Sequence, residues 1–471
     1  MKPLPLSRIA QWTGGRLHGA DVLIDAVAND TRTLDASDGR AALYVALKGE
    51  RFDGHEHVPA AQQAGARAAL VSRVVEGPLP QVVVADTERA LAAFAAALQH
   101  TRTTKVAAIT GSNGKTSVKS MLLPILQRAT VLGEAGAYAN PGNRNNEIGL
   151  PLAVLDAPEH AQFAIYEMGA GKPGDIAYLT AIVRPDAALV NNIAPAHLER
   201  MGNLLGVADT KAAIYDALPP EGVAVINADD AFAPYFAERA HGRRLIRFGL
   251  EASADVGARD VVLDADGSHF VLVTPQGEVD IALALTGRHN VRNALAAASM
   301  ALGLGASLEA IGDGLAAARP VAGRLVRHRL GNGALLIDDS YNANPGSLNA
   351  AVELLAANGQ GWLVLGDMRE LGDDARALHA EAGRRAKAAG IARLYGLGPL
   401  SAATVEAFGA GARHFESHEA LVAMLAADLA AAAPAAIATD AAPTVLVKGS
   451  RGSAMDRIVK ALLAGEAADA A

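Results

Sequence analysis

Short apolar segments that end in polar or glycine residues recur through the middle of the chain, and helical patterns separate them. Such segments occur at residues 106–110, 163–167, 187–193 and 223–227. Uninterrupted apolar runs of this length are typical of parallel strands that are buried on both faces. The sequence therefore predicts a doubly wound α/β region, in which ligands bind at the carboxyl ends of the strands.

Two further regions flank this one. Residues 1–101 mix alternating segments, such as 41–47, with helical patterns, such as 89–99. After Arg319 and Pro320, apolar segments with polar ends begin again, in ALLIDDS, WLVLGDM, RLYGLG and TVLVKGS. A chain of 471 residues is expected to form about three domains. We predict a small N-terminal α/β domain at 1–101, a central P-loop-type doubly wound ATPase domain at 102–320 and a C-terminal Rossmann-like α/β domain at 321–471.

Composition excludes several classes of function. The chain has no cysteine, so disulfides, thiolate catalysis and Cys-based zinc sites are excluded. A net charge of −8 without a long Lys/Arg stripe argues against a nucleic-acid partner. The N-terminus lacks the apolar run of a signal peptide, and no uncharged apolar segment is long enough to cross a bilayer. We therefore expect a cytoplasmic enzyme that acts on small molecules as a monomer.

The segment ITGSNGKTSV, at 109–118, has the pattern of a phosphate-binding loop between a strand and a helix. Backbone N–H groups and a helix N-terminus then surround one point, which favours an anion. The loop residues are Gly111, Ser112, Asn113, Gly114, Lys115, Thr116 and Ser117. Lys115 would approach the β/γ-phosphates, and the Thr116 hydroxyl would bind Mg²⁺. The alternative is an ordinary βα turn, for which Ile109 argues because the usual pattern needs glycine there. Pro124 is a separate departure, which should kink or end the helix.

Polar residues at two other strand ends could complete a phosphoryl-transfer site. Glu167 ends the strand in FAIYEMG, where a metal-binding carboxylate would lie, and His197 follows the strand in ALVNNI. A lone Glu at a strand end is more often a solvated cap, and a lone His is more often an ordinary loop residue. Because Glu167 and His197 follow strands of the same predicted sheet as the phosphate-binding loop, we favour a functional role for both. Lys211, on a predicted helix, would by itself be interpreted as an exposed lysine.

Together these stretches resemble the Mur ligases, the ATP-dependent amide-bond-forming enzymes of peptidoglycan synthesis. That family uses the shorter loop TGSNGKTS, so Ile109 is not an anomaly. The resemblance extends over nearly the whole chain, through NDTRTLDASDGRAALYVALKGERFDGH, NRNNEIGLPLAVL, YEMG, NNIAPAHLERMG, TGRHNVRNALAA, AGR, DDSYNANPGS, LGDMRELG and VLVKGSRGS. Among these, DDSYNANP, LGDMRELG and VKGSRG are similar to the member that adds D-alanyl-D-alanine to UDP-N-acetylmuramoyl tripeptide.

The resemblance implies ATP and Mg²⁺ as cofactors and assigns roles to the residues around the loop. Lys115 would bind the ATP phosphates, while Thr116 and Glu167 would ligate one Mg²⁺. His197 would help to hold a second metal ion. Lys211 matches the lysine that the family carbamylates, which turns a cation that would repel the metal into a carboxylate-like anion.

The resemblance also implies roles for residues further along the chain. Asn146 would contact the phosphate or acyl-phosphate region, and Asn290 and Asn293, one helical turn apart, would read the adenine. Arg324 would reach the phosphates and Asp339 the ribose. The candidates for substrate binding are Thr31, Arg32 and Lys48 for the UDP end, with Asn344, Lys448 and Arg451 in the last domain. The alternative for all these loop residues is a turn or cap former.

The reaction implied is ATP-dependent ligation through an acyl phosphate, with ADP and phosphate as products and with domain closure assembling the site. A different Mur-type or folylpolyglutamate-type ligase is one alternative. Another is a P-loop NTPase that couples hydrolysis to conformational work, and a third is a non-catalytic sugar-nucleotide-binding protein. The third residue of the tripeptide, meso-diaminopimelate or lysine, stays open.

Overall fold

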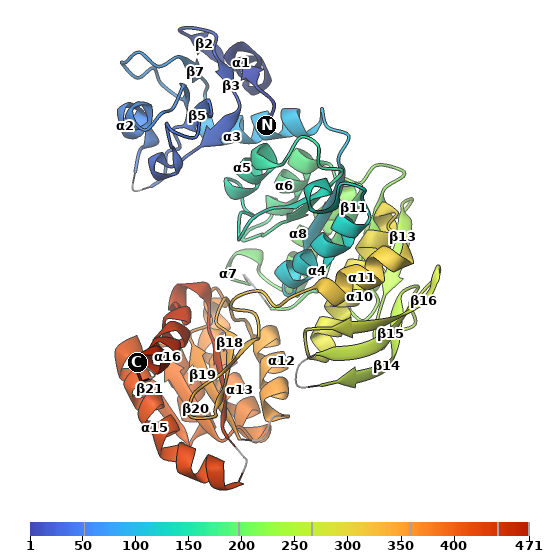
Figure 1. Ribbon diagram of the computed structural model, residues 1–471, viewed down its shortest axis with the longest axis vertical. Coiled ribbons are helices and arrows are strands. Elements are labelled where there is room, and N and C mark those ends of the chain that lie inside the picture. The colour runs from blue at the N-terminus through green and yellow to red at the C-terminus, as the bar shows by residue number, and fades with distance from the viewer. Residues whose placement is uncertain (51, 196–197, 265–266, 358–359, 440–441, 470–471) are drawn as a thin grey trace.

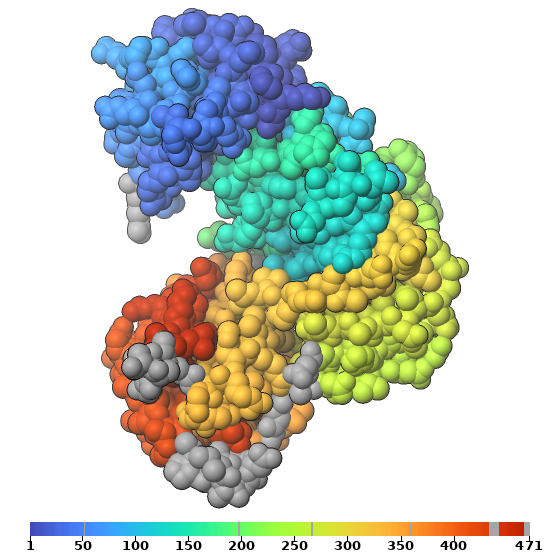
Figure 2. Space-filling model, viewed as in Figure 1, coloured from blue at the N-terminus to red at the C-terminus, as the bar shows by residue number. Residues whose placement is uncertain are grey.

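The computed structural model describes residues 1–50, 52–195, 198–264, 267–357, 360–439 and 442–469. The chain forms an N-terminal, a central and a C-terminal region, each built on a sheet with helices packed against it (Figure 1). Figure 2 shows the N-terminal and C-terminal regions facing each other across an open gap, which the central region bounds on one side. The predicted α/β fold class is confirmed, whereas the exact domain boundaries stay predictions.

The central region contains a six-stranded parallel sheet in the order β13-β12-β11-β8-β10-β9. Its strands are β8 (Lys105–Thr110), β9 (Ala137–Ala139), β10 (Phe163–Glu167), β11 (Ala187–Val190), β12 (Val223–Asn227) and β13 (Arg244–Phe248). Each of the four apolar segments in the sequence is one of these strands. β11 is shorter than predicted, because Asn191 and Asn192 leave the strand and bond to the loop that follows β8.

Helices cover both faces of this sheet, as the doubly wound pattern predicts. They are α4 (Lys115–Arg128), α5 (Gly149–Asp156), α6 (Asp175–Val183), α7 (Leu198–Met201), α8 (Leu204–Asp216), α9 (Ala233–Arg239), α10 (Arg288–Leu304) and α11 (Leu308–Ala317). Alternate residues of β8 enter separate cores: Val106 and Ala108 pack with α5, α6 and α8, while Ala107 and Ile109 pack with α4, α10 and α11.

Pro124 lies inside α4 but does not end it. The helix continues to Arg128 because its apolar face, including Val118, Leu122 and Ile125, is buried in the core. Gly314 of α11 packs so closely on this helix that a side chain there would collide with Ile125. Tertiary packing therefore outweighs the one backbone hydrogen bond that proline removes.

An antiparallel sheet, which the sequence reading missed, is attached to the central region. Its strands are β14 (Gly257–Leu263), β15 (Ser268–Thr274) and β16 (Gly277–Leu283), in chain order. Buried and more exposed residues alternate along β15, so one face packs on the core beside α10 and α11. This sheet appears in yellow-green in Figure 1.

The N-terminal region has a five-stranded sheet in the order β2-β7-β6-β5-β4. Its elements are β1 (Leu4–Pro5), α1 (Leu6–Thr13), β2 (Arg16–His18), β3 (Leu23–Ile24), β4 (Ala26–Ala28), η1 (Thr31–Thr33), β5 (Ala42–Val45), η2 (Gly54–His57), α2 (Val58–Gln63), β6 (Ala68–Val71), β7 (Gln81–Val83) and α3 (Thr87–Gln99). β4, β5, β6 and β7 pair in parallel. Leu91 and Phe94 of α3 share a core with α5 and α6, which joins this region to the central one.

The C-terminal region has a six-stranded sheet in the order β17-β18-β22-β19-β20-β21, parallel except for β17 at its edge. Its strands are β17 (Val326–Arg329), β18 (Leu335–Asp339), β19 (Gly361–Gly366), β20 (Arg393–Leu397), β21 (Ala412–Phe415) and β22 (Thr444–Lys448). The helices are α12 (Pro345–Ala356), η4 (Gly372–Asp374), α13 (Ala375–Ala388), α14 (Ser401–Phe408), α15 (His418–Thr439), η5 (Arg451–Ser453) and α16 (Asp456–Asp469). None of the described helices has the length and apolar character needed to span a membrane.

Candidate active site

A cavity of about 1080 Å³ lies at the carboxyl ends of the central strands and extends to the C-terminal region. Most of the residues predicted for the site line it. They are Gly111, Ser112, Asn113, Gly114, Lys115, Ser117, Asn146, Glu167, Lys211, Asn290, Asn293, Arg324, Asp339, Asn344 and Lys448. The topology explains this, because parallel strands place their carboxyl ends at one edge of the sheet.

The phosphate loop needs its glycines for both conformation and space. Gly111 and Gly114 have φ angles of 143° and 79°, which side chains rarely adopt. A side chain at Gly114 would also collide with the amides of Asn191 and Asn293. Ile109 is fully buried in β8 and is paired with Glu167 of β10, so this position belongs to the sheet rather than to the loop.

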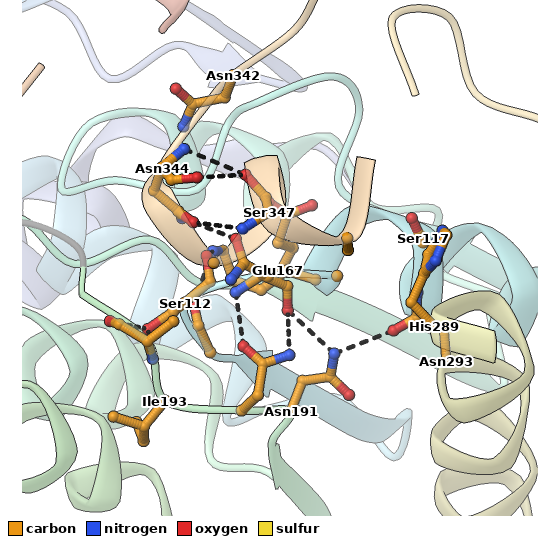
Figure 3. Close-up of a pocket in the computed structure, with 18 of the residues that line it drawn as sticks. Ser112, Ser117, Glu167, Asn191, Ile193, His289, Asn293, Asn342, Asn344 and Ser347 are labelled. Carbon is orange, nitrogen blue, oxygen red and sulfur yellow. Dashed lines mark hydrogen bonds between the residues drawn. The ribbon is translucent and has the colours of Figure 1, made fainter. Parts of the chain in front are cut away.

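A layer of asparagines holds the loop in place (Figure 3). The Asn191 amide donates to the Asn113 carbonyl at 3.0 Å and to Asn293 Oδ1 at 3.1 Å. The backbone N–H of Asn113 donates to Asn192 Oδ1 at 2.9 Å. The sequence reading did not select Asn191 or Asn192, although the NN pair at the end of an apolar strand was a usable signal. The loop is therefore pre-organised by side chains from two neighbouring elements.

Asn290 and Asn293 lie on one face of α10, as their spacing predicts. Asn293 Nδ2 donates to Asn290 Oδ1 at 3.4 Å, and Asn290 Nδ2 donates to the carbonyl of Thr286 at 2.9 Å. The structure places Asn293 directly against the phosphate loop, as a support for it. The role of both amides in reading adenine stays a prediction.

Lys115 is folded back onto its own loop. Its Nζ donates to the carbonyl of Gly111 at 2.7 Å and to that of Ser112 at 3.4 Å. Burial lowers the pKa of Lys115, and the nearby charge of Arg324 lowers it further, while Glu167 opposes both. A phosphate in the loop would compensate these half-buried cations, which is why the site favours an anion.

Glu167 is buried at the end of β10 among donors. Its carboxylate accepts hydrogen bonds from the Thr116 hydroxyl and the Asn145 amide, both at 3.0 Å, and lies 3.2 Å from Lys119 Nζ. Burial alone would raise the pKa of Glu167, but the charges of Lys119 and Lys115 and these hydrogen bonds outweigh it, and the pKa is lowered. The carboxylate is therefore ionised at neutral pH.

Lys119 was not selected from the sequence, where it is one more helix lysine. In the structure it is buried, and its Nζ also donates to the carbonyls of Asn140 at 2.9 Å and Gly142 at 3.1 Å. It thus connects α4, the 140–142 loop and Glu167.

The donor set at this point fits Mg²⁺. Thr116 and Glu167 offer the oxygen ligands that Mg²⁺ prefers, beside a loop suited to phosphate. Among the described residues, no group of three or more His, Cys, Asp and Glu side chains could hold a metal by itself. Phosphate and water oxygens would therefore have to complete the shell. His197, predicted for a second ion, lies outside the described residues.

Lys211 is buried in α8 and is only 1% exposed, so the interpretation as a solvated helix lysine is wrong. Within the described parts of the chain, its amine has no hydrogen bond or ion pair. Burial, followed by the charge of Lys115, lowers the pKa of Lys211 to about 7, while Asp175 acts in the opposite direction. A large fraction of this amine is therefore unprotonated, and nucleophilic, at neutral pH.

The C-terminal region touches the phosphate loop directly. Asn344, which caps α12, donates from Nδ2 to Asn113 Oδ1 at 2.7 Å. Arg324 Nη2 donates to the Thr116 hydroxyl at 3.3 Å. These bonds join residues more than two hundred positions apart in the sequence. The cavity is thus built from two regions of the chain.

Other predicted residues have protein partners that sequence did not reveal. Asp339 and Lys448 are opposite each other on β18 and β22 and form a buried ion pair at 2.5 Å. Asn146 Oδ1 accepts from the backbone N–H of Gly149 at 2.8 Å, so it does act as a turn former beside the cavity. Arg451 does not line the cavity, and its guanidinium lies 5.7 Å from the centre of the Tyr341 ring.

The first-region candidates lie at a separate place. Thr31 and Arg32 follow β4 and Lys48 follows β5, so they share the carboxyl edge of two parallel strands. The Arg32 side chain is 87% exposed and pairs with Asp30. None of these residues lines the cavity.

A glycine-containing loop between a parallel strand and a helix, with an ionised carboxylate and two buried lysines around it, defines a P-loop-type nucleotide-binding enzyme. The family model of the Mur ligase middle domain matches residues 109–301, and that of the Mur ligase glutamate ligase domain matches residues 323–451. The chain therefore belongs to the Mur ligase family, as the sequence motifs predicted.

Relatives and solved structures agree with this assignment. The chain is 43% identical to UDP-N-acetylmuramoyl-tripeptide--D-alanyl-D-alanine ligase of Escherichia coli (strain K12), over 98% of this chain and 99% of that one. It is 34% identical to the ligase of the same name from Bacillus subtilis (strain 168), over 97% and 98%. A crystal structure of MurF from Acinetobacter baumannii matches with a TM-score of 0.90 and 33% identity, over 98% and 99%. The MurF ligase of Thermotoga maritima in complex with ADP matches with a TM-score of 0.81 and 25% identity, over 95% and 98%.

Proposed function

We propose that this chain is an ATP-dependent ligase that joins D-alanyl-D-alanine to the terminal carboxylate of UDP-N-acetylmuramoyl tripeptide, with ADP and phosphate as products. The observation that carries this proposal is the cavity in which the phosphate loop, Glu167 and the buried Lys211 meet residues of the C-terminal region. The relatives that match the whole chain have names that state the same two substrates.

The chemistry follows from the poor reactivity of a carboxylate toward amines. The terminal carboxylate of the tripeptide would accept the γ-phosphoryl group of ATP and become an acyl phosphate. The free amine of D-alanyl-D-alanine would then attack the acyl carbon. The tetrahedral intermediate would collapse to the amide and release phosphate, which takes the bridging oxygen with it. The protein's task is to hold these anionic groups together and to exclude water.

The residues around the loop suit this task. Lys115, Arg324 and the loop N–H groups would hold the phosphates. Thr116 and Glu167 would hold Mg²⁺, which would neutralise charge that develops on the transferred group.

Lys211 has the properties that carbamylation requires. Its unprotonated amine can add to CO₂ and lose a proton, which yields an anion in place of a potential cation. We propose that this anion and His197 hold a second metal ion. The burial of Lys211 and its pKa of about 7 support the first step.

We propose that the N-terminal region holds the UDP end and closes toward the other two regions across the gap in Figure 2. Its candidates, Arg32 and Lys48, are exposed and lie outside the cavity. Small-angle scattering with an ATP analogue and the sugar nucleotide together should show compaction, and an unchanged radius of gyration would contradict closure. We further propose a monomer acting in the cytoplasm, because one chain supplies the whole cavity and the reaction consumes ATP.

The experiment that tests the proposed function is phosphate release with UDP-N-acetylmuramoyl tripeptide and D-alanyl-D-alanine, supplied separately and together. The ligase should release phosphate only when both are present, in a one-to-one ratio with the amide product. Release with ATP alone would favour an NTPase instead. Running the assay with the diaminopimelate and the lysine tripeptides also identifies the third residue.

A further inference from the structure

Arg324 lies on the connection between α11 and β17, and an unusual backbone presents it to the phosphate loop. Gly323 and Leu325, on either side of it, have φ angles of 73° and 55°. A left-handed conformation is uncommon for leucine and persists only where the surrounding structure enforces it. The direction of the Arg324 side chain is therefore determined by its neighbours.

Tyr341 is the neighbour that contacts both the backbone and the side chain of this segment. Its backbone N–H donates to the Gly323 carbonyl at 3.2 Å. A side chain at Gly323 would meet Tyr341 Cβ at 3.1 Å, so the two segments are in close contact. The Tyr341 ring lies under the Arg324 guanidinium, whose central carbon is 4.3 Å from the ring centre.

The guanidinium has few other contacts that could fix its plane. Arg324 Nε is buried and has no hydrogen-bond partner among the described residues. The bond from Nη2 to the Thr116 hydroxyl, at 3.3 Å, is long. The partly buried guanidinium instead lies over the aromatic face at 4.3 Å, where the negative charge of the ring face attracts it. The ring is thus the main support of the guanidinium.

The same ring also supports a second cation. The guanidinium of Arg451, which follows β22, lies 5.7 Å from the ring centre. The phenol hydroxyl of Tyr341 makes no hydrogen bond among the described residues. The aromatic face, rather than the hydroxyl, is therefore the part of Tyr341 that does the positioning.

We propose that Tyr341 is a positioning residue whose ring holds Arg324 in the orientation that serves the phosphates of ATP. This inference rests on the proposed function, because it assumes that Arg324 acts on ATP. Arg324 touches Thr116, which is expected to bind the Mg²⁺ that accompanies the β- and γ-phosphates. The positioned cation should therefore favour the triphosphate over the diphosphate.

The test compares Tyr341→Leu, which removes the ring, with Tyr341→Phe, which keeps it. Tyr341→Leu should lower kcat/KM by about 3- to 30-fold, the range expected for losing a partly buried cation–π contact. Calorimetric titration without the peptide substrates gives the affinity of each variant for the two nucleotides. The preference of Tyr341→Leu for a non-hydrolysable ATP analogue over ADP should fall by a similar factor. Tyr341→Phe should restore both quantities to within about threefold of the unmodified chain.

A double-mutant cycle with Arg324→Gln separates positioning from a general structural role. If Tyr341 acts through Arg324, the glutamine substitution should cost much less in the Tyr341→Leu background than in the unmodified chain. Lys387→Met is a matched control, because it removes a cation 4.7 Å from the centre of the Phe408 ring in the same region, outside the cavity. It should leave the nucleotide preference unchanged.

Several results would overturn the proposal. These are equal weakening of both nucleotides in Tyr341→Leu, failure of Tyr341→Phe to restore the preference, or full additivity with Arg324→Gln. Failure of the proposed function looks different, because the unmodified chain would then not require both substrates for phosphate release. The nucleotide titrations would still decide the role of Tyr341 in that case.

Discussion

The central and the N-terminal sheets place candidate residues in the same topological position but in opposite environments. In both, the residues follow the carboxyl ends of parallel strands. In the central sheet, Glu167 is 2% exposed and has three side-chain partners. In the N-terminal sheet, Arg32 is 87% exposed and pairs with a residue two positions away. Among the described residues, Lys48 has no side-chain hydrogen bond.

The difference arises from what covers each edge. The C-terminal region places Arg324 and Asn344 over the central edge, where both bond to the phosphate loop. The N-terminal edge has no such bond to another region in the described structure. We infer that the phosphate half of the site is formed before substrates bind, whereas the sugar-nucleotide half is completed by the substrate. We therefore expect substitutions around the phosphate loop to lower kcat, and substitutions at the N-terminal edge to raise KM.

Replacing Lys115 with methionine should have the largest effect. It removes the cation expected at the β/γ-phosphates while keeping most of the apolar stem. We expect turnover to fall by about a thousandfold, as in other sites that lose a phosphate-directed cation. Initial-rate measurements of ADP formation check this, with Lys2→Met, at a side chain that is 72% exposed, as control. A loss of less than tenfold would mean that Lys115 is not needed for the transfer.

Replacing Lys211 with alanine should nearly abolish activity, by more than about a hundredfold if it holds a metal through a carbamate. Added short carboxylic acids should partly restore turnover, because they can occupy the space of the missing anion. The measurement is the rate of amide formation with and without acetate or propionate. Full activity in the alanine variant would contradict the assignment.

In the N-terminal region, Arg32→Ala should weaken the binding of the UDP-linked tripeptide. We expect KM for the UDP-linked tripeptide to rise by about tenfold with kcat largely kept, since an exposed residue that binds substrate and transition state equally affects KM. Steady-state kinetics with the tripeptide as the varied substrate gives both constants. A fall in kcat at constant KM would remove the contrast between the two halves.

Asn344 permits a finer test of the contact between regions. Its Oδ1 caps α12 by accepting from the Ser347 N–H, and its Nδ2 donates to Asn113. Asn344→Asp keeps the cap but loses the donor, whereas Asn344→Ala loses both. We expect Asp to reduce kcat a few-fold without lowering Tm, and Ala to destabilise by a further amount of about 1 kcal/mol. Equal Tm values for the two variants would show that the cap contributes nothing.

A further prediction concerns pH and His289, which lines the cavity. Burial, with the charges of Lys448 and Arg292, lowers the pKa of His289 from 6.5 to about 4. As pH falls, His289 binds a proton in the unfolded chain before it does so in the folded chain. The free energy of unfolding therefore keeps its full value above pH 6.5 and decreases between pH 6.5 and 4. Urea unfolding at pH 7 and pH 5 should show a smaller loss of stability for His289→Gln than for the unmodified chain. Identical losses would contradict this.

Local pattern made part of the fold and site predictable. The strands at 163–167 and 223–227 and the loop at 111–117 depend on short runs of adjacent residues, and the structure has them where the sequence put them. The burial of Lys211 and the contacts of Lys119 and Tyr341 depend on which elements pack together, and no local pattern encodes that. Likewise, Pro124 was overvalued as a helix breaker because the packing of α4 could not be seen.

In the proposed reaction the γ-phosphoryl group of ATP passes to the tripeptide carboxylate. The most direct measurement uses tripeptide labelled with ¹⁸O in its terminal carboxylate, followed by mass spectrometry of the released phosphate. If an acyl phosphate forms, each phosphate should carry one ¹⁸O atom from the tripeptide, and only when D-alanyl-D-alanine is present. Phosphate that contains oxygen from water and none from the tripeptide would contradict the account.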